Sequence, residues 1–299
     1  MADIGCSEAT TAAGEALIGS APDAVAWVCL EQNGPWGKKA WTDSHLDPDL
    51  GRQIEEVASA HGVRPSLVRR PGRAESGTTA ERQVLVAFTH PDTSWLLVGR
   101  VSDPADLLAL DWVAVAAGDL EAVRRSLPGL EPSTAAQLLV CTNGTRDTCC
   151  ARLGRPVAAS AQASYPDRVW EVTHTSGHRF AATTVLLPSG VLHGRVLDAA
   201  GIVAAADRGE LELTGYRGRS TWSAGAQVAE DHVRRTQGVT GINDLTVVGE
   251  IDAWRVRHRD GRSWWVAVSV STEGERPESC GKDPAPIKHY AARTVSSGP

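Results

Sequence analysis

The chain has 299 residues, of which 42% are hydrophobic and 22% are charged. These fractions are typical of a folded globular protein and exclude a chain that is mostly disordered. The formal net charge of -6 gives no basic excess that would neutralise a phosphate backbone, so we expect no nucleic-acid partner. At about 150 residues per domain, the length predicts two domains.

The sequence shows no targeting or membrane signal. Its first basic residue is Lys38, so the positively charged start of a secretory signal peptide is missing. The longest apolar run, from Ala199 to Ala206, is far shorter than the roughly 20 residues that span a bilayer. Six cysteines are too few for a scaffold of disulfides. We therefore expect a cytoplasmic protein with no membrane partner.

The first part of the chain is predicted to form a small α/β unit. Apolar residues at three- and four-residue spacing indicate a helix that begins after Asp47 or Asp49 and ends at Gly62. A stretch with two prolines at 118–132 is the candidate domain boundary. The other expected elements are an extended arm over residues 1–24, strands at 26–30, 66–70, 83–89 and 95–101, and a short helix from 104 to about 110.

The same order of elements follows a second time. The second set comprises a strand at 137–141, a helix from 147 to about 163, strands at 169–173, 182–188 and 191–196, and a helix from 198 to about 208. The segments Leu97–Asp103 and Leu192–Asp198 share five of seven residues, and chance similarity of so short a window is the alternative. Because the order of elements also matches, we infer an internal repeat.

The remaining chain is predicted to extend the second unit. It has a helix at 224–235, a strand pair at 245–257 and 263–270, and a proline-rich tail from Pro277. Strands, helices and an antiparallel hairpin in each unit predict an α/β fold with two thioredoxin-like mixed sheets. The expected domains are residues 1–130, without a cofactor, and residues 131–299, with the extension beginning near residue 215.

Two cysteines and two histidines form the candidate site. Cys141 ends a predicted strand and Cys150 begins the next helix, so the loop between them lies where α/β sheets usually build sites. His174 and His178 follow another strand, on a loop because Ser176 and Gly177 break a helix. The fold would bring these loops together.

This set of side chains is compatible with more than one centre. Zinc accepts two thiolates and two imidazoles, but its structural sites use a narrower C-x2-4-C spacing. A [2Fe–2S] cluster is larger than a single ion and tolerates the wide loop, and two histidines on one iron are the Rieske arrangement. A thiol–disulfide oxidoreductase would need a C-x-x-C sequence at the strand-to-helix turn, and the chain has none.

Two motifs contain the four candidate side chains: C-T-N-G-T-R-D-T-C-C at 141–150 and H-T-S-G-H-R-F-A at 174–181. They resemble the C-[ST]-H-G-x-R-D-x-x-C and H-x-G-G-H-R-F-A elements of the sucrase/ferredoxin-like proteins. Asn143 and Ser176 depart from these patterns. Further similar stretches are E-Q-N-G-P-W-G at 31–37, L-P-S-G at 187–190, G-R-V at 194–196 and S-C-G at 279–281.

The resemblance implies a thioredoxin-like protein with a [2Fe–2S] cluster. It assigns Cys141 and Cys150 to one iron and His174 and His178 to the other. The implied function is proton-coupled one-electron transfer by a carrier rather than a stand-alone enzyme. Because no G-x-G-x-x-G sequence follows a strand, we expect separate reductase and acceptor proteins as redox partners. The sugar-cleaving activity in the family's name would need a positioned carboxylate pair, which no motif proposes.

The other cysteines and one further histidine receive simpler interpretations. Cys29 is predicted to be a small buried hydrophobe, and Cys149 a spare thiol beside the cluster. Cys6 and Cys280 are placed in loops with structural roles. His193 is predicted to face the hairpin beside the site, and a contact with a ligand residue is the less favoured alternative. A hydrogen-bonded pair of Arg146 and Asp147 is a further hypothesis for the site loop.

Overall fold

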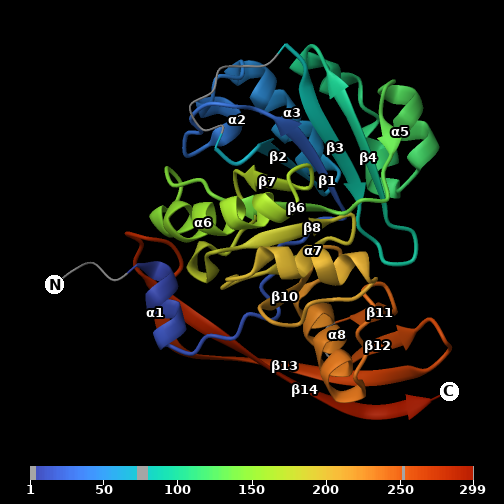
Figure 1. The fold of residues 1–299 in the computed structure, drawn as a ribbon. Coiled ribbons are helices and arrows are strands. Elements are labelled where there is room, and N and C mark those ends of the chain that lie inside the picture. The colour runs from blue at the N-terminus through green and yellow to red at the C-terminus, as the bar shows by residue number, and fades with distance from the viewer. Residues whose placement is uncertain (1–4, 73–79, 251–252, 299) are drawn as a thin grey trace.

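The computed structural model describes residues 5–72, 80–250 and 253–298, and in them the chain forms two sheets (Figure 1). The large sheet has the strand order β10-β9-β8-β6-β7-β2-β1-β3-β4-β5. Its strands are β1 (Ala26–Glu31), β2 (Val63–Arg69), β3 (Arg82–Phe88), β4 (Trp95–Val101), β5 (Glu131–Pro132), β6 (Gln137–Cys141), β7 (Val169–Val172), β8 (Thr184–Leu187), β9 (Val191–His193) and β10 (Tyr216–Arg219).

The small sheet has the order β11-β12-β13-β14 and lies at the C-terminal end of the chain. Its strands are β11 (Leu245–Glu250), β12 (Ala253–His258), β13 (Ser263–Pro277) and β14 (Pro284–Gly298). The helices are α1 (Cys6–Ala12), α2 (Ala40–Asp43), α3 (Pro48–Ala60), η1 (Pro104–Ala109), α4 (Trp112–Ala117), α5 (Leu120–Ser126), α6 (Thr148–Ser164), η2 (His178–Phe180), α7 (Ala199–Asp207) and α8 (Ala224–Gln237). None of the helices in the described ranges is long and apolar enough to cross a bilayer.

The large sheet consists of two halves with the same topology. In the first half β1 pairs parallel with β2 and antiparallel with β3, which pairs antiparallel with β4. In the second half β6, β7, β8 and β9 repeat this pattern. Asp103 and Asp198, which end the two similar segments, both cap the following helix by accepting a backbone hydrogen bond. The predicted mixed α/β fold with two similar units is confirmed.

The two halves meet where β2 pairs antiparallel with β7. Arg69 and Glu171 face each other across this seam, with a nitrogen–oxygen distance of 2.7 Å and side chains only 3% and 5% exposed. Glu171 also accepts a hydrogen bond from the hydroxyl of Thr142, beside Cys141. One continuous sheet therefore joins the halves, and a buried ion pair at the seam touches the loop that carries the first candidate ligand.

Local sequence explains the best-defined helices. The Asp47 carboxylate caps α3 by accepting hydrogen bonds from the amides of Asp49 and Leu50, and Pro48 occupies the first turn. The apolar face of α3 buries Ile54 and Ala58 against the first half of the sheet. The predicted helix at this place is confirmed, as is the one corresponding to α6.

The two ends of the chain differ from the prediction. Residues 6–12 form α1 instead of part of an extended arm, so Cys6 begins a helix and does not lie in a loop. This short helix has no apolar period, and tertiary contacts hold it, such as the hydrogen bond from the Ser7 hydroxyl to the Ala181 carbonyl. The predicted proline-rich tail is the edge strand β14, where Pro284 and Pro286 are tolerated because one side of the strand is unpaired. Parts of the predicted arm, strand pair and tail fall on residues 1–4, 251–252 and 299, outside the described residues.

The segment after residue 215 contributes more than the predicted extension. It adds β10 to the large sheet and then forms α8, which packs against the small sheet around its own apolar cluster. The long β13–β14 hairpin runs from this sheet back beneath the molecule towards α1 (Figure 1). The tip of the hairpin thereby reaches the loops of the second half of the large sheet.

Candidate metal centre

Cys141 and Cys150 lie where the sequence predicts them. Cys141 ends β6, and Cys150 is the third residue of α6, whose N-cap is Asp147. Both thiols are buried. Gly154 allows α6 to pack on the end of β6, because a Cβ there would lie 2.2 Å from the Cys141 carbonyl oxygen. Cys150, in the first turn of α6, lies at the positive end of the helix dipole.

The loop after β7 positions the two histidines. Their imidazole rings stack with centroids 4.5 Å apart and an interplanar angle of 21°. Gly177 has a φ of 70°, and a Cβ on it would lie 2.4 Å from the guanidinium of Arg217. Glycine is therefore required at 177 on two grounds, and the tight turn that it makes brings His178 back beside His174.

The structure brings all four predicted ligands together. Cys150 Sγ lies 3.3 Å from His178 Nδ1, and the Cys141 thiol lies close enough to Cys150 to affect its pKa. His174 Nδ1 is buried and has no hydrogen-bond partner. A buried polar atom without a partner is costly in a folded protein, so this nitrogen is suited to binding a metal. The side chains that meet here are two thiols and two imidazoles.

The surroundings of Cys141 and Cys150 favour the loss of one proton from the two thiols. The hydrogen bond from Cys150, assisted by the backbone amides of Thr175 and Asn143, lowers the pKa of Cys141 to about 7 against the opposing effect of burial. The same pairing, together with burial, raises the pKa of Cys150. One thiolate is therefore readily available at neutral pH, and the second becomes favourable when a cation is bound.

The two imidazoles are neutral at physiological pH. Burial lowers the pKa of His178 to about 4, and burial together with the charge of Arg64 lowers the pKa of His174 well below its usual range. Metals bind the neutral imidazole, so neither ring has to release a proton before it acts as a ligand.

Two arginines that the sequence did not single out shape the histidine loop. Arg64 in β2 donates to the His174 carbonyl at 3.3 Å and to the Ser176 hydroxyl at 3.1 Å. The buried Arg217 in β10 donates to the Ser176 carbonyl at 3.0 Å. No motif marks these residues, because they come from strands on either side of the site. Their positive charges favour the thiolates of the candidate centre.

The two departures from the family pattern make local contacts. Ser176 has a φ of 64°, which accounts for glycine in the family element, and its hydroxyl takes the hydrogen bond from Arg64. Asn143 donates from its side-chain amide to the Gly37 carbonyl at 3.0 Å, tying the cysteine loop to the 31–37 stretch. Neither residue occupies a ligand position.

The histidines are reached from two surface clefts. His174 lines one of about 590 Å³, together with Lys38, Lys39, Arg64 and Arg146. Both histidines line a second cleft of about 480 Å³, bounded on one side by the β13–β14 hairpin. The histidine side of the centre therefore lies nearer to the surface than the buried cysteine side.

A buried carboxylate holds the histidine loop to the ends of the chain. Glu15 accepts hydrogen bonds from Arg179 in η2 at 3.0 Å and from Arg276 in β13 at 2.8 Å. Burial alone would raise the pKa of Glu15, but the hydrogen bonds from Arg276 and Arg179 outweigh it and hold the pKa below its ordinary value. The ionised carboxylate therefore stabilises the folded state.

This contact predicts a component of acid sensitivity. The stabilisation from Glu15 is fully present above the unfolded-state pKa of about 4.3 and is lost as the pH falls through the lower folded-state value. We expect Glu15→Gln to reduce the free energy of unfolding at pH 7 and to lack this component. Urea unfolding across the acid range measures both effects, and parallel pH curves for the variant and the native chain would contradict the prediction.

Three of the other sequence interpretations can be checked directly. Cys29 is fully buried in β1 among apolar side chains, which confirms it as a core residue. His193 lies in the predicted hairpin, and its Nε2 is hydrogen-bonded to the Glu212 carbonyl at 2.8 Å. Its Nδ1 is buried without a hydrogen-bond partner among the described residues, so the alternative contact with a ligand residue is not made. The hypothesis of a hydrogen bond between Arg146 and Asp147 was wrong. Among the described residues, the Arg146 side chain donates to the Lys38 carbonyl, and the Asp147 carboxylate accepts from the Cys149 amide.

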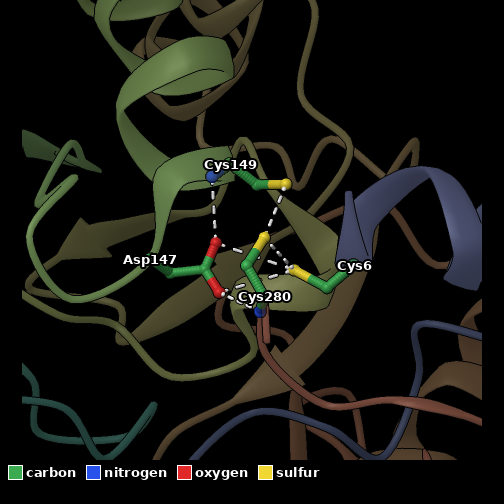
Figure 2. A group of neighbouring side chains, drawn as sticks. All are labelled: Cys6, Asp147, Cys149 and Cys280. Atoms are coloured by element: carbon green, nitrogen blue, oxygen red, sulfur yellow. Dashed lines mark hydrogen bonds between the residues drawn. The ribbon is translucent and has the colours of Figure 1, made fainter. Parts of the chain in front are cut away.

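Three of the four remaining cysteines form a group of their own. Figure 2 shows Cys6, Cys149 and Cys280 around the carboxylate of Asp147. All four potential ligand atoms lie within 4.8 Å of one another. No pattern in the sequence indicates this group, because α1 and the β13–β14 hairpin are far from α6 along the chain.

Comparison with known proteins identifies the family. A family model of sucrase/ferredoxin-like proteins matches residues 17–218. This range contains both cysteines and both histidines of the candidate centre, but neither Cys6 nor Cys280. Neither curated proteins nor solved structures give a significant match. Because the matched range covers more than half of the chain, the chain belongs to the sucrase/ferredoxin-like family.

Proposed function

We propose that the protein transfers electrons through a [2Fe–2S] cluster held by Cys141 and Cys150 on one iron and by His174 and His178 on the other. The observation that carries the proposal is the convergence of these two thiols and two imidazoles, with His174 Nδ1 buried and without a partner. When bound, such a cluster accepts and returns one electron.

The surroundings of the four residues suit this group. Cys141 supplies a thiolate near neutral pH, and the two buried imidazoles are neutral. Two neutral imidazoles in place of two thiolates make a cluster less negative and easier to reduce. The guanidinium groups of Arg64 and Arg217 favour the additional negative charge of the reduced state. The buried cysteine side also keeps water away from the thiolates.

A cluster fits the spacing better than a single zinc ion does. Among the described residues, the potential ligand atoms of Cys6, Asp147, Cys149 and Cys280 all lie within 4.8 Å of one another. Those of the two cysteines and two histidines proposed here are spread more widely. A wider donor set suits a two-iron cluster, which bridges two pairs of ligands. The chemistry of the donors alone would also allow zinc.

We infer that redox partners dock on the histidine side. His174 lines a cleft with the side chains of Lys38, Lys39, Arg64 and Arg146, while Asp23 and Glu55 are the acidic residues there. The excess of positive charge favours a partner with an acidic surface. Both a reductase and an acceptor protein would reach the centre through this opening or through the cleft beside the hairpin.

Metal and sulfide analysis tests the proposal. We expect purified full-length protein to be red-brown and to contain about two iron and two sulfide per chain. Reduction with dithionite is expected to bleach the visible spectrum and to produce a paramagnetic species, and air restores the colour. Colourless protein that holds zinc at Cys141 and Cys150, and no iron after anaerobic purification, would overturn it.

A further inference from the structure

We propose that Cys6, Cys149 and Cys280 form a second metal site, separate from the candidate cluster, that binds one zinc ion with the carboxylate of Asp147 as the fourth ligand. The site joins three segments that are far apart in the sequence: the start of α1, the first turn of α6, and the tip of the β13–β14 hairpin (Figure 2). It lies beyond the function proposed above and does not depend on it.

The distances between the sulfur atoms fit zinc. Cys280 Sγ lies 3.4 Å from Cys149 Sγ and 3.5 Å from Cys6 Sγ. Zinc–sulfur bonds of about 2.3 Å in a tetrahedron place neighbouring sulfurs about 3.8 Å apart. Shifts of a few tenths of an ångström would therefore produce zinc geometry at these two contacts.

Asp147 is oriented as a fourth ligand by three other groups. Its Oδ2 accepts hydrogen bonds at 2.8 Å from the Ser279 hydroxyl and from the Cys280 amide. Its Oδ1 accepts one from the Cys149 amide at 2.9 Å, and Cys6 Sγ lies 3.6 Å from Oδ1 and 3.5 Å from Oδ2. A carboxylate oxygen has two lone pairs, so Oδ1 keeps one of them for a cation after binding this amide. Metal-binding carboxylates are commonly oriented by such hydrogen bonds.

The site is closed, as structural zinc sites are. Cys6 and Cys149 are 1% and 2% exposed, and Cys280 is half-buried. The backbone of Gly5 crosses directly over the sulfur of Cys149, and a Cβ on Gly5 would lie 2.8 Å from that sulfur. Glycine is thus the residue that allows the N-terminal segment to close over the site. Sites with four protein ligands and no open position are typical of structural zinc.

A disulfide explains the group less well. The shortest sulfur–sulfur distance, 3.4 Å, is far from the roughly 2.05 Å of a disulfide bond. Any one disulfide would also leave the third thiol buried beside an ionised carboxylate. A divalent cation reduces the combined negative charge of the thiolates and the carboxylate. It would also join α1 and the tip of the β13–β14 hairpin to α6, the helix that carries Cys150.

Zinc analysis and X-ray absorption of the full-length protein test the proposal. We expect one zinc per chain, with three sulfur neighbours at about 2.3 Å and one oxygen neighbour at about 2.0–2.2 Å. Cys6→Ser and Cys280→Ser are expected to lose at least nine tenths of this zinc. Cys29→Ser, at a buried thiol elsewhere, serves as the control and retains it. The absorption spectrum of the native chain needs no variant, so it decides the issue even if a variant folds poorly.

The outcomes also separate this site from the cluster. Zinc that is lost in Cys141→Ser and kept in Cys280→Ser lies at the other centre and overturns the proposal. A mass lower by two hydrogens in the non-reduced protein would indicate a disulfide and would also overturn the proposal. Protein that takes up no zinc when Zn²⁺ is supplied would overturn it as well. Loss of zinc in Cys280→Ser supports it, whether or not iron is present at Cys141 and Cys150.

Discussion

Replacing Cys150 with serine is expected to remove the iron, the sulfide and the visible absorbance of the purified protein, while replacing the adjacent Cys149 with serine leaves all three in place. The reason is geometric. Cys150 Sγ faces Cys141 and His178, whereas Cys149 Sγ faces Cys280 on the other side of the helix start. The side chains of two neighbouring residues thus point into two different groups of side chains.

The two variants are matched controls for each other. Both change a buried sulfur to oxygen in the first turn of α6, so a general weakening of the helix would affect them alike. Iron and sulfide analysis with visible spectroscopy measures the outcome, and circular dichroism checks that each variant is folded. Loss of iron from Cys149→Ser with retention in Cys150→Ser would reverse the assignment.

Removing the carboxylate of Glu171 should produce the largest loss of stability. Glu171→Ala would leave Arg69 charged and buried at the seam between the halves of the large sheet. Breaking a buried ion pair in this way costs about 3–5 kcal/mol of the free energy of unfolding. It would also release the hydroxyl of Thr142, next to Cys141. Urea unfolding of the variant and the native chain measures the difference.

Two comparisons interpret this loss. Glu210→Ala removes the partner of Arg208 in an exposed pair, which should change the free energy of unfolding by less than about 1 kcal/mol. The double change of Arg69 to Met and Glu171 to Leu removes both charges and should recover much of the stability. Equal effects of Glu171→Ala and Glu210→Ala would contradict the role of the seam.

Local patterns predicted the elements that carry the candidate cluster. The strand expected at 137–141 is β6, and the helix expected from Asp147 is α6 with Asp147 as its cap. Strand ends and helix caps depend on residues that are close in the sequence, so the loops that hold the cysteines and histidines could be located. The repeated order of elements likewise predicted two similar halves, which the strand order shows to share one sheet.

Contacts between distant segments could not be predicted in this way. Arg64 and Arg217 support the histidine loop from two other strands, and no spacing in the sequence connects them to it. Cys6 and Cys280 lie 274 residues apart, so their meeting depends on how α1 and the hairpin pack on the second half of the sheet. The helix α1 itself depends on such contacts, since a helix of seven residues has little stability of its own.

Histidine ligation is the central claim, and electron–nuclear double resonance of the reduced protein tests it most directly. The protein would be produced with histidine labelled with a heavy nitrogen isotope and reduced with dithionite. We predict a [2Fe–2S] signal with an average g value below that of all-cysteine clusters and with couplings from labelled nitrogens of two histidines. The low g value and the couplings should both be lost when His174 and His178 are replaced by cysteine. A reduced cluster without coupling to labelled histidine nitrogen would contradict the account.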